Sequence, residues 1–146
     1  MISHFQAHGQ FSFTVDRGLL TTEVQGPWNA EFVKLWMQET RPIVEELAAQ
    51  GNWASLAIVK GSLLSTPEAM TILSELMHFA VTDMNLIASA KVVTKEVAGF
   101  GLVEPSFRHM YADLCHFDFF GDADLAATWL RQILQEKRTF VPRSLL

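Results

Sequence analysis

The chain has 146 residues, a formal net charge of −5 at pH 7 and a hydrophobic fraction of 49%. This length suits one domain, and an acidic balance without any block of Lys or Arg disfavours nucleic acid and anionic membrane surfaces as partners. Eleven Phe and four Trp residues exceed the aromatic bulk of an ordinary small core, which indicates a dimer interface or an apolar ligand cavity.

Cysteine content and the N-terminal residues predict a cytoplasmic protein. Cys115 is the single cysteine, so no disulfide can form within the chain, as expected in a reducing compartment. The stretch MISHFQAHGQ lacks the basic start and apolar run of a signal peptide, and no apolar run approaches the roughly 20 residues that cross a bilayer. We therefore expect one intracellular domain over residues 1–146, with no membrane partner.

A β-hairpin is the first element that the sequence predicts. In FSFTVDRGLLTTEVQG, apolar and polar residues alternate around Gly18, which supplies the positive φ of a tight turn. The two strands are expected near residues 9–16 and 19–25.

A helix with an internal proline follows. Asn29 is a suitable N-cap, apolar residues recur at helical spacing, and Gly51 ends the pattern. Pro42 lacks a backbone N–H, so we expect a kink at this point. The next run, WASLAIVK at 53–60, is short and continuously apolar, which is typical of a strand covered on both faces.

Helix and strand patterns continue to alternate towards the C-terminus. After a polar loop, a second helix is expected over residues 67–82, and the apolar run LIASAKVVT at 86–94 predicts another buried strand. Pro105 is expected to start a third helix. HFDFF at 116–120 alternates as a strand, and Asp122 caps a last helix.

The element order β-β-α-β-α-β-α-β-α predicts an α/β fold. Short crossovers of this kind give a mixed, mostly parallel five-stranded sheet with about four helices, and the first strand is antiparallel at an edge. Residues 138–146 are apolar without a clear period, so we expect a tail that is either loose or laid on a partner chain.

The C-terminal stretch HFDFFGDADLAATWLRQIL combines an alternating strand, an acidic turn and a helix with Ala-x-x-Trp-Leu spacing, occupied by Ala126, Trp129 and Leu130. Packing explains the motif, since a small residue lets the helix approach the sheet and the larger pair fills the space one turn later. The stretch resembles the ending of the SpoIIAA-like family of uncharacterised bacterial proteins, and the element order resembles the SpoIIAA-like, or STAS, fold. This resemblance implies a non-enzymatic regulatory or protein-interaction module.

The loop in VKGSLLSTPEAM lies where STAS regulators carry a phosphorylated serine, and Ser62, Ser65 and Thr66 are the available counterparts. The family's Asp-x-Ser pattern is absent, because neither serine has an Asp two residues earlier. A helix N-terminus would still favour a phosphate or another anion. The simpler interpretation is that Thr66 is an N-cap and Pro67 the first helical residue, with the loop kept as a candidate site for a partner or an anion.

GFGLVE at 99–104 begins like a glycine-rich dinucleotide-binding loop. Glu104 stands where the third glycine would allow close helix packing, and its carboxylate would repel a pyrophosphate. We therefore interpret the two glycines as loop residues and expect no cofactor.

A group of possible ligands or catalysts lies between the third helix and the following strand. His109 and Asp113 are four residues apart on one helix face, so an ion pair explains them. Cys115 and His116 are neighbours that point to opposite faces of a strand, whereas zinc needs three or four converging ligands. We expect no metal site and no catalytic set.

Three functions follow from these patterns. The leading hypothesis is a STAS-like protein-interaction module, acting with a protein partner and forming a homodimer. The alternative is a carrier of a small apolar or lipid-like ligand, indicated by the aromatic excess. The third is an enzyme that uses His109 or Cys115.

Overall fold

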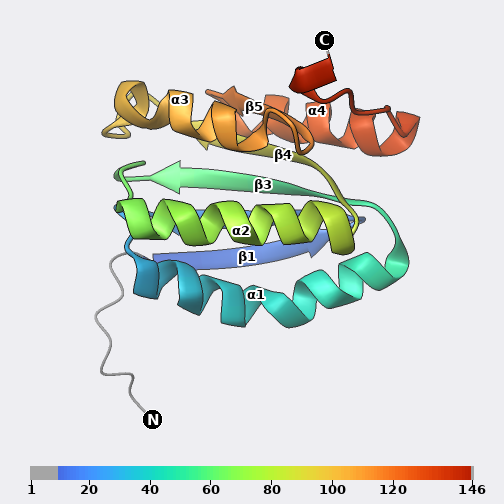
Figure 1. Cartoon of the computed structure of the whole chain (residues 1–146), viewed down its shortest axis with the longest axis horizontal. Coiled ribbons are helices and arrows are strands. Elements are labelled where there is room, and N and C mark those ends of the chain that lie inside the picture. The colour runs from blue at the N-terminus through green and yellow to red at the C-terminus, as the bar shows by residue number, and fades with distance from the viewer. Residues whose placement is uncertain (1–9, 146) are drawn as a thin grey trace.

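A five-stranded sheet lies between helices on both faces in the computed structural model of the chain, which describes residues 10–145 (Figure 1). The α/β class, the mixed five-stranded sheet and the four helices predicted from the sequence are confirmed. The elements are β1 (Gln10–Asp16), β2 (Leu19–Gln25), α1 (Ala30–Gln50), β3 (Trp53–Lys60), α2 (Pro67–Asp83), β4 (Leu86–Val93), α3 (Phe100–Tyr111), β5 (His116–Phe120), α4 (Ala123–Glu136) and a short 3-10 helix (Arg143–Leu145).

The strands lie in chain order across the sheet, β1-β2-β3-β4-β5. β1 and β2 pair antiparallel, and the other three pairs are parallel. Arg17 and Gly18 connect the hairpin with φ angles of 47° and 80°, so both residues of the turn are left-handed. A two-residue turn of this hand matches the twist of the strands, which confirms the predicted hairpin.

Successive side chains of the central strands point to opposite faces of the sheet. Because these strands are mostly apolar, both faces of the sheet are apolar. One face packs on α1, α2 and α3, and the other packs on α4. On the α4 side, small residues of the sheet meet fully buried residues of the helix, namely Ala54, Ala88 and Ala90 against Ala126, Leu130 and Ile133. Trp129 lies against Phe120, with ring centroids 5.4 Å apart. The packing interpretation of the Ala-x-x-Trp-Leu motif is therefore confirmed.

The prediction that Pro105 starts the third helix is wrong, because α3 begins at Phe100. Gly99 precedes it with φ 84°, and its carbonyl accepts hydrogen bonds from Leu102 and Val103. Pro105 therefore lies inside the helix, where its missing N–H leaves only the carbonyl four residues earlier without its usual donor. The left-handed glycine, and not the proline, marks the start of this helix.

The described part of the C-terminal tail lies against α3 of the same chain. The Arg143 N–H donates to the Ala112 carbonyl at 3.0 Å, and the Ser144 N–H donates to Asp113 Oδ1 at 2.8 Å. The first bond satisfies a carbonyl just after the end of α3, where carbonyls lack helical partners, and the second is accepted by a side-chain carboxylate. None of the helices within residues 10–145 has the length and apolar character needed to span a membrane.

Candidate functional site

The hydroxyls of the loop between β3 and α2 each have a nearby backbone partner. Ser62 is buried, and its Oγ accepts the Leu64 N–H at 3.0 Å. Ser65 Oγ donates to the Leu63 carbonyl at 3.4 Å, and Thr66 Oγ1 accepts the Ala69 N–H at 3.1 Å. The predicted N-cap role of Thr66 is confirmed, whereas phosphorylation or partner binding at these residues stays a prediction.

This loop also holds Trp28, which follows β2. The Trp28 N–H donates to the Leu64 carbonyl at 3.0 Å, and the Thr66 N–H donates to the Trp28 carbonyl at 3.1 Å. The backbones approach so closely that a Cβ on Gly26 would lie 1.9 Å from the Ser62 carbonyl oxygen. Main-chain hydrogen bonds therefore fix the position of Trp28. Its side chain is buried, with 6% of its surface exposed.

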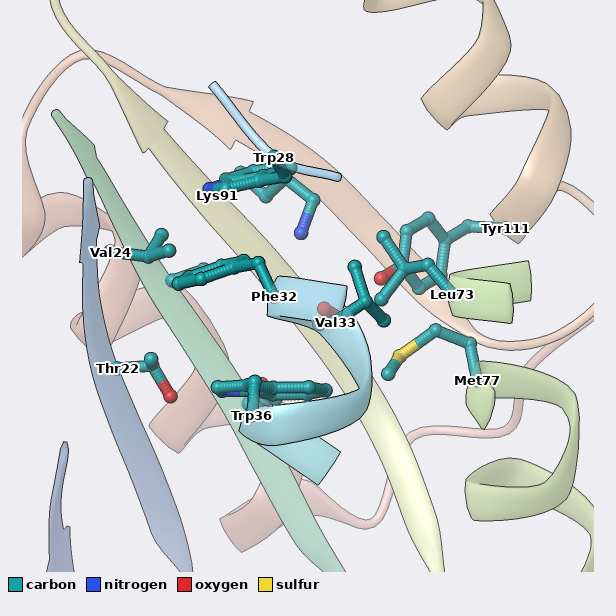
Figure 2. A pocket seen from close by; sticks show the side chains of 13 residues that line it. Thr22, Val24, Trp28, Phe32, Val33, Trp36, Leu73, Met77, Lys91 and Tyr111 are labelled. Carbon is teal, nitrogen blue, oxygen red and sulfur yellow. The ribbon is translucent and has the colours of Figure 1, made fainter. Parts of the chain in front are cut away.

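A cavity of about 60 Å³ lies between the sheet and helices α1 and α2, next to Trp28 (Figure 2). Its walls are mostly apolar, with Phe32, Val33 and Trp36 from α1 and Leu73 and Met77 from α2. Its polar lining comes from the strands, namely Thr22, Ser55, Ser89 and Lys91, with Tyr111 at the end of α3.

The register of the strands explains why the sheet is hollow here. Thr22 pairs with Ala57, and Ala57 pairs with Lys91, so the three side chains form one row across this face. Ser55 and Ser89 pair in the neighbouring row. Small residues in the middle of both rows leave space that a closely packed core would fill.

Lys91 is the unusual member of this lining. It lies on a central strand and is 6% exposed, yet no carboxylate within residues 10–145 forms an ion pair with it. Its Nζ lies 5.0 Å from the ring centroid of Phe107 and 5.9 Å from that of Tyr111. Burial lowers the pKa of Lys91 from 10.5 to about 8, so most of the amine is still protonated at pH 7. The protein holds a positive charge in an apolar site with aromatic faces as its neighbours.

Two residues of the cavity lining each carry a buried polar atom that also lacks a protein partner in the described part of the chain. Thr22 Oγ1 and Trp28 Nε1 are buried without a hydrogen bond within the described residues. Burial raises the pKa of Tyr111, so its phenol stays protonated at neutral pH. Buried polar groups are almost always hydrogen-bonded in folded proteins, so each exception needs an explanation such as strain, a catalytic role, or a bound water or ion. The arrangement suits a ligand with an apolar body and a polar, negatively charged end.

No side-chain hydrogen bond or ion pair within residues 10–145 joins the residues considered for catalysis. Asp113 accepts the Ser144 N–H, and His116 Nε2 lies 3.2 Å from the Arg138 carbonyl oxygen. Cys115 is buried, and burial raises the pKa of its thiol to about 12, so the nucleophilic thiolate is scarce at neutral pH. Within residues 10–145, no three His, Cys, Asp or Glu side chains are grouped as metal ligands.

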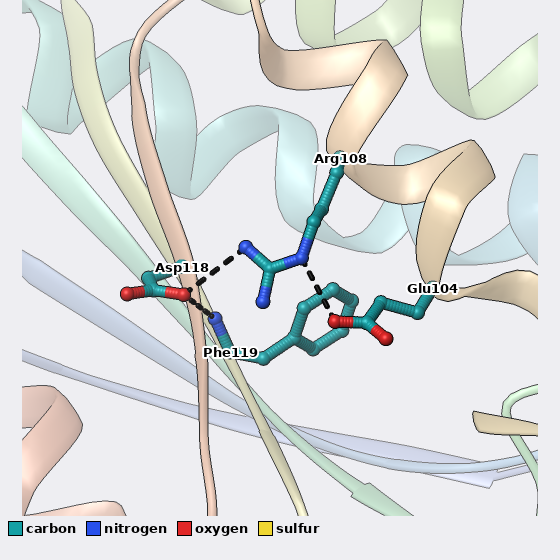
Figure 3. Close-up of polar contacts among 4 residues, drawn as sticks. All are labelled: Glu104, Arg108, Asp118 and Phe119. Carbon is teal, nitrogen blue, oxygen red and sulfur yellow. Dashed lines mark hydrogen bonds and ion pairs between the residues drawn. The ribbon is translucent and has the colours of Figure 1, made fainter. Parts of the chain in front are cut away.

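Arg108 joins α3 to β5 (Figure 3). Its Nε lies 2.9 Å from Glu104 Oε2 and its Nη1 lies 3.2 Å from Asp118 Oδ1, which also accepts the Phe119 N–H. The hydrogen bond to Glu104 is the main reason that the pKa of Arg108 is raised. The guanidinium also lies 5.2 Å from the Phe119 ring centroid. These charges satisfy one another, so we interpret the cluster as structural.

Lys91 does not belong to any site predicted from the sequence. The signal was present in LIASAKVVT, because a single lysine inside an apolar run that reads as a fully covered strand must be buried or sit at a strand end. The sequence does not show which face of the sheet Lys91 occupies or whether an acidic partner lies opposite. Both depend on the packing of α1 and α2.

Comparisons with protein-family models, with curated proteins and with solved structures found no match for this chain. The similarity to the SpoIIAA-like family therefore stays a prediction from the sequence pattern.

Proposed function

We propose that the protein binds a small apolar ligand with an acidic group, and that the anionic end of this ligand lies beside Lys91. The observation that supports the proposal is a buried lysine without an acidic partner in the described chain, at the wall of an apolar cavity.

The charge of Lys91 favours an anion over a neutral or cationic ligand. A buried ammonium without a partner destabilises the folded protein, and a carboxylate placed beside it would offset that penalty. The free hydroxyl of Thr22 can add a neutral hydrogen bond from the same row of the sheet.

The aromatic walls favour an apolar body next to the acid. Phe32 and Trp36 face the cavity from α1, and Trp28 lies at its end (Figure 2). These rings can cover aliphatic or aromatic carbon and exclude water from the ion pair, which strengthens it. The ligand class is therefore a monoacid with a hydrocarbon body, bound by a non-enzymatic carrier or sensor.

Isothermal titration calorimetry with octanoate and its uncharged counterpart octanamide tests this function. We expect octanoate to bind the native protein, and Lys91→Met to weaken that binding roughly 10- to 100-fold, as for the loss of a charged hydrogen bond. Lys95→Met, at an exposed position just after β4, is the matched control and should bind like the native protein. Equal binding of octanoate by the native protein and Lys91→Met, or tighter binding of octanamide, would contradict the proposal.

The protein-interaction role and the homodimer predicted from the sequence remain separate proposals. Size-exclusion chromatography with light scattering tests the homodimer. A monomer at high protein concentration would exclude it without affecting the ligand proposal.

A further inference from the structure

A groove between α1 and α2, which reaches down to residues of the sheet, adjoins the cavity that contains Lys91. The groove has a volume of about 400 Å³, and three of its lining residues, Trp36, Ser55 and Met77, also line the cavity. The two spaces therefore share part of their walls. Figure 2 shows Trp36 and Met77 at one end of the cavity, the former from α1 and the latter from α2.

The cavity by itself is too small for a typical ligand. Sites for small molecules usually measure roughly 300–1,000 Å³. A cavity of about 60 Å³ equals the liquid volume of about two water molecules, so it has room for little more than the acid group. A longer ligand anchored at Lys91 must extend past its walls, and the adjoining groove supplies the missing volume.

Polarity differs between the two spaces in a way that orients the ligand. Two polar groups of the groove are already bonded, since Thr40 Oγ1 donates to the Trp36 carbonyl at 2.8 Å and the Trp53 indole N–H donates to the Met84 carbonyl. Arg41 and Glu45 at its rim lie 3.8 Å apart and neutralise each other. The unpaired charge lies on the cavity side, at Lys91, so an acid points inwards and its tail outwards.

The outer part of the groove presents apolar surface to solvent. Phe79 of α2 lines it and is 49% exposed, which is high for a phenylalanine. Val44 and Leu76 line it from the two helices. An alkyl chain in this position would cover apolar carbon from both sides.

We infer that the ligand is an amphipathic acid with an extended tail, whose chain passes between Trp36 and Met77 and lies in the groove between α1 and α2. This inference rests on the proposed function, because it uses Lys91 as the anchor for the acid. It adds the substrate class, a chain acid of fatty-acid type, and the residues that select chain length.

A homologous series of acids tests the inference by calorimetry. Affinity of the native protein should rise from butanoate to octanoate to dodecanoate, by about fourfold for each methylene that the groove buries. Phe79→Glu places a charge at the outer part of the groove, and should weaken dodecanoate at least tenfold while leaving butanoate unchanged. Leu102→Glu, at another exposed apolar residue on α3, is the matched control and should leave the series unaltered.

The outcomes separate this inference from the proposed function. Binding that depends on Lys91 but is equal for all three acids would overturn the tail position and leave the anchor intact. If Lys91→Met binds every acid as tightly as the native protein does, both the proposed function and this inference are overturned. A change of oligomeric state in Phe79→Glu with an unaltered chain-length series would show that the groove is a surface between copies of the chain, and would also overturn the inference.

Discussion

At the scale of single residues, the central feature is one lysine on the buried face of the sheet that packs against α1, α2 and α3. Lys91 points into an apolar layer where a hydrophobic side chain would fit the pattern of β4. A residue that destabilises the fold in this way is typical of a functional site, where stability is given up for binding.

Removing the charge should therefore stabilise the protein. Because the pKa of Lys91 is lowered from 10.5 to about 8, the folded state binds fewer protons than the unfolded state between these values, and stability rises with pH across this window. Below pH 8, burial of the charged amine lowers the free energy of unfolding by its full amount, roughly 3 kcal/mol at 1.36 kcal/mol per pKa unit. Urea denaturation should show Lys91→Met to be more stable than the native protein at pH 7, with the difference falling below about 1 kcal/mol at pH 10.

A free energy of unfolding that is lower for Lys91→Met than for the native protein at pH 7 would contradict this account. It would mean that the ammonium has a stabilising partner in the folded protein. Lys95→Met serves again as the exposed control and should show no such pH dependence.

The same residue predicts proton uptake on binding. An anion beside Lys91 raises the pKa of the amine, so at pH 8 the amine is half protonated in the free protein and fully protonated in the complex. Calorimetry with octanoate in buffers of different ionisation enthalpy should report about half a proton taken up at pH 8 and less at pH 6. An unchanged proton count across this range would place the acid away from Lys91.

At the scale of elements, most boundaries follow from local signals. Asn29, Thr66 and Asp122 cap their helices as predicted, and the hairpin turn has the left-handed geometry that its glycine indicated. The start of α3 was missed, because a proline at a plausible first position outweighed a glycine whose left-handed φ is visible only in the fold. Local chemistry thus predicts caps and turns well, while competing signals need tertiary structure to resolve them.

The Thr66 cap gives a quantitative prediction for α2. Thr66→Ala removes the acceptor of the Ala69 N–H and should lower the free energy of unfolding by about 1 kcal/mol in urea denaturation. Thr66→Ser keeps the acceptor and should remain near the native value. Equal stability of all three proteins would show that the hydroxyl does not act as a cap.

The contact between the segments after β2 and β3 predicts a larger effect. Gly26→Ala would force a Cβ against the Ser62 carbonyl and should destabilise the fold by more than about 2 kcal/mol. Gly121→Ala, where no atom lies within 4 Å of the added Cβ, should be nearly neutral. Thermal unfolding of both variants by circular dichroism checks the contrast, and two equal melting temperatures would contradict it.

At the scale of the whole molecule, the two faces of the sheet have different roles. The α4 face is closely packed with small residues against a buried helix stripe, whereas the opposite face contains the cavity, the buried lysine and the adjoining groove. The sequence predicted an apolar ligand or an interface from its aromatic excess, and several of those aromatic residues line the cavity. The site itself could not be predicted, because Lys91, Trp36 and Met77 meet only through the crossing of α1 and α2 over the sheet.

A crystal structure of the native protein with dodecanoate tests the central claim most directly. We predict the carboxylate within hydrogen-bonding distance of Lys91 Nζ, with the alkyl chain passing between Trp36 and Met77 into the groove. A carboxylate at Arg41 with the chain pointing inwards, or a ligand bound elsewhere with the cavity unchanged, would contradict the account.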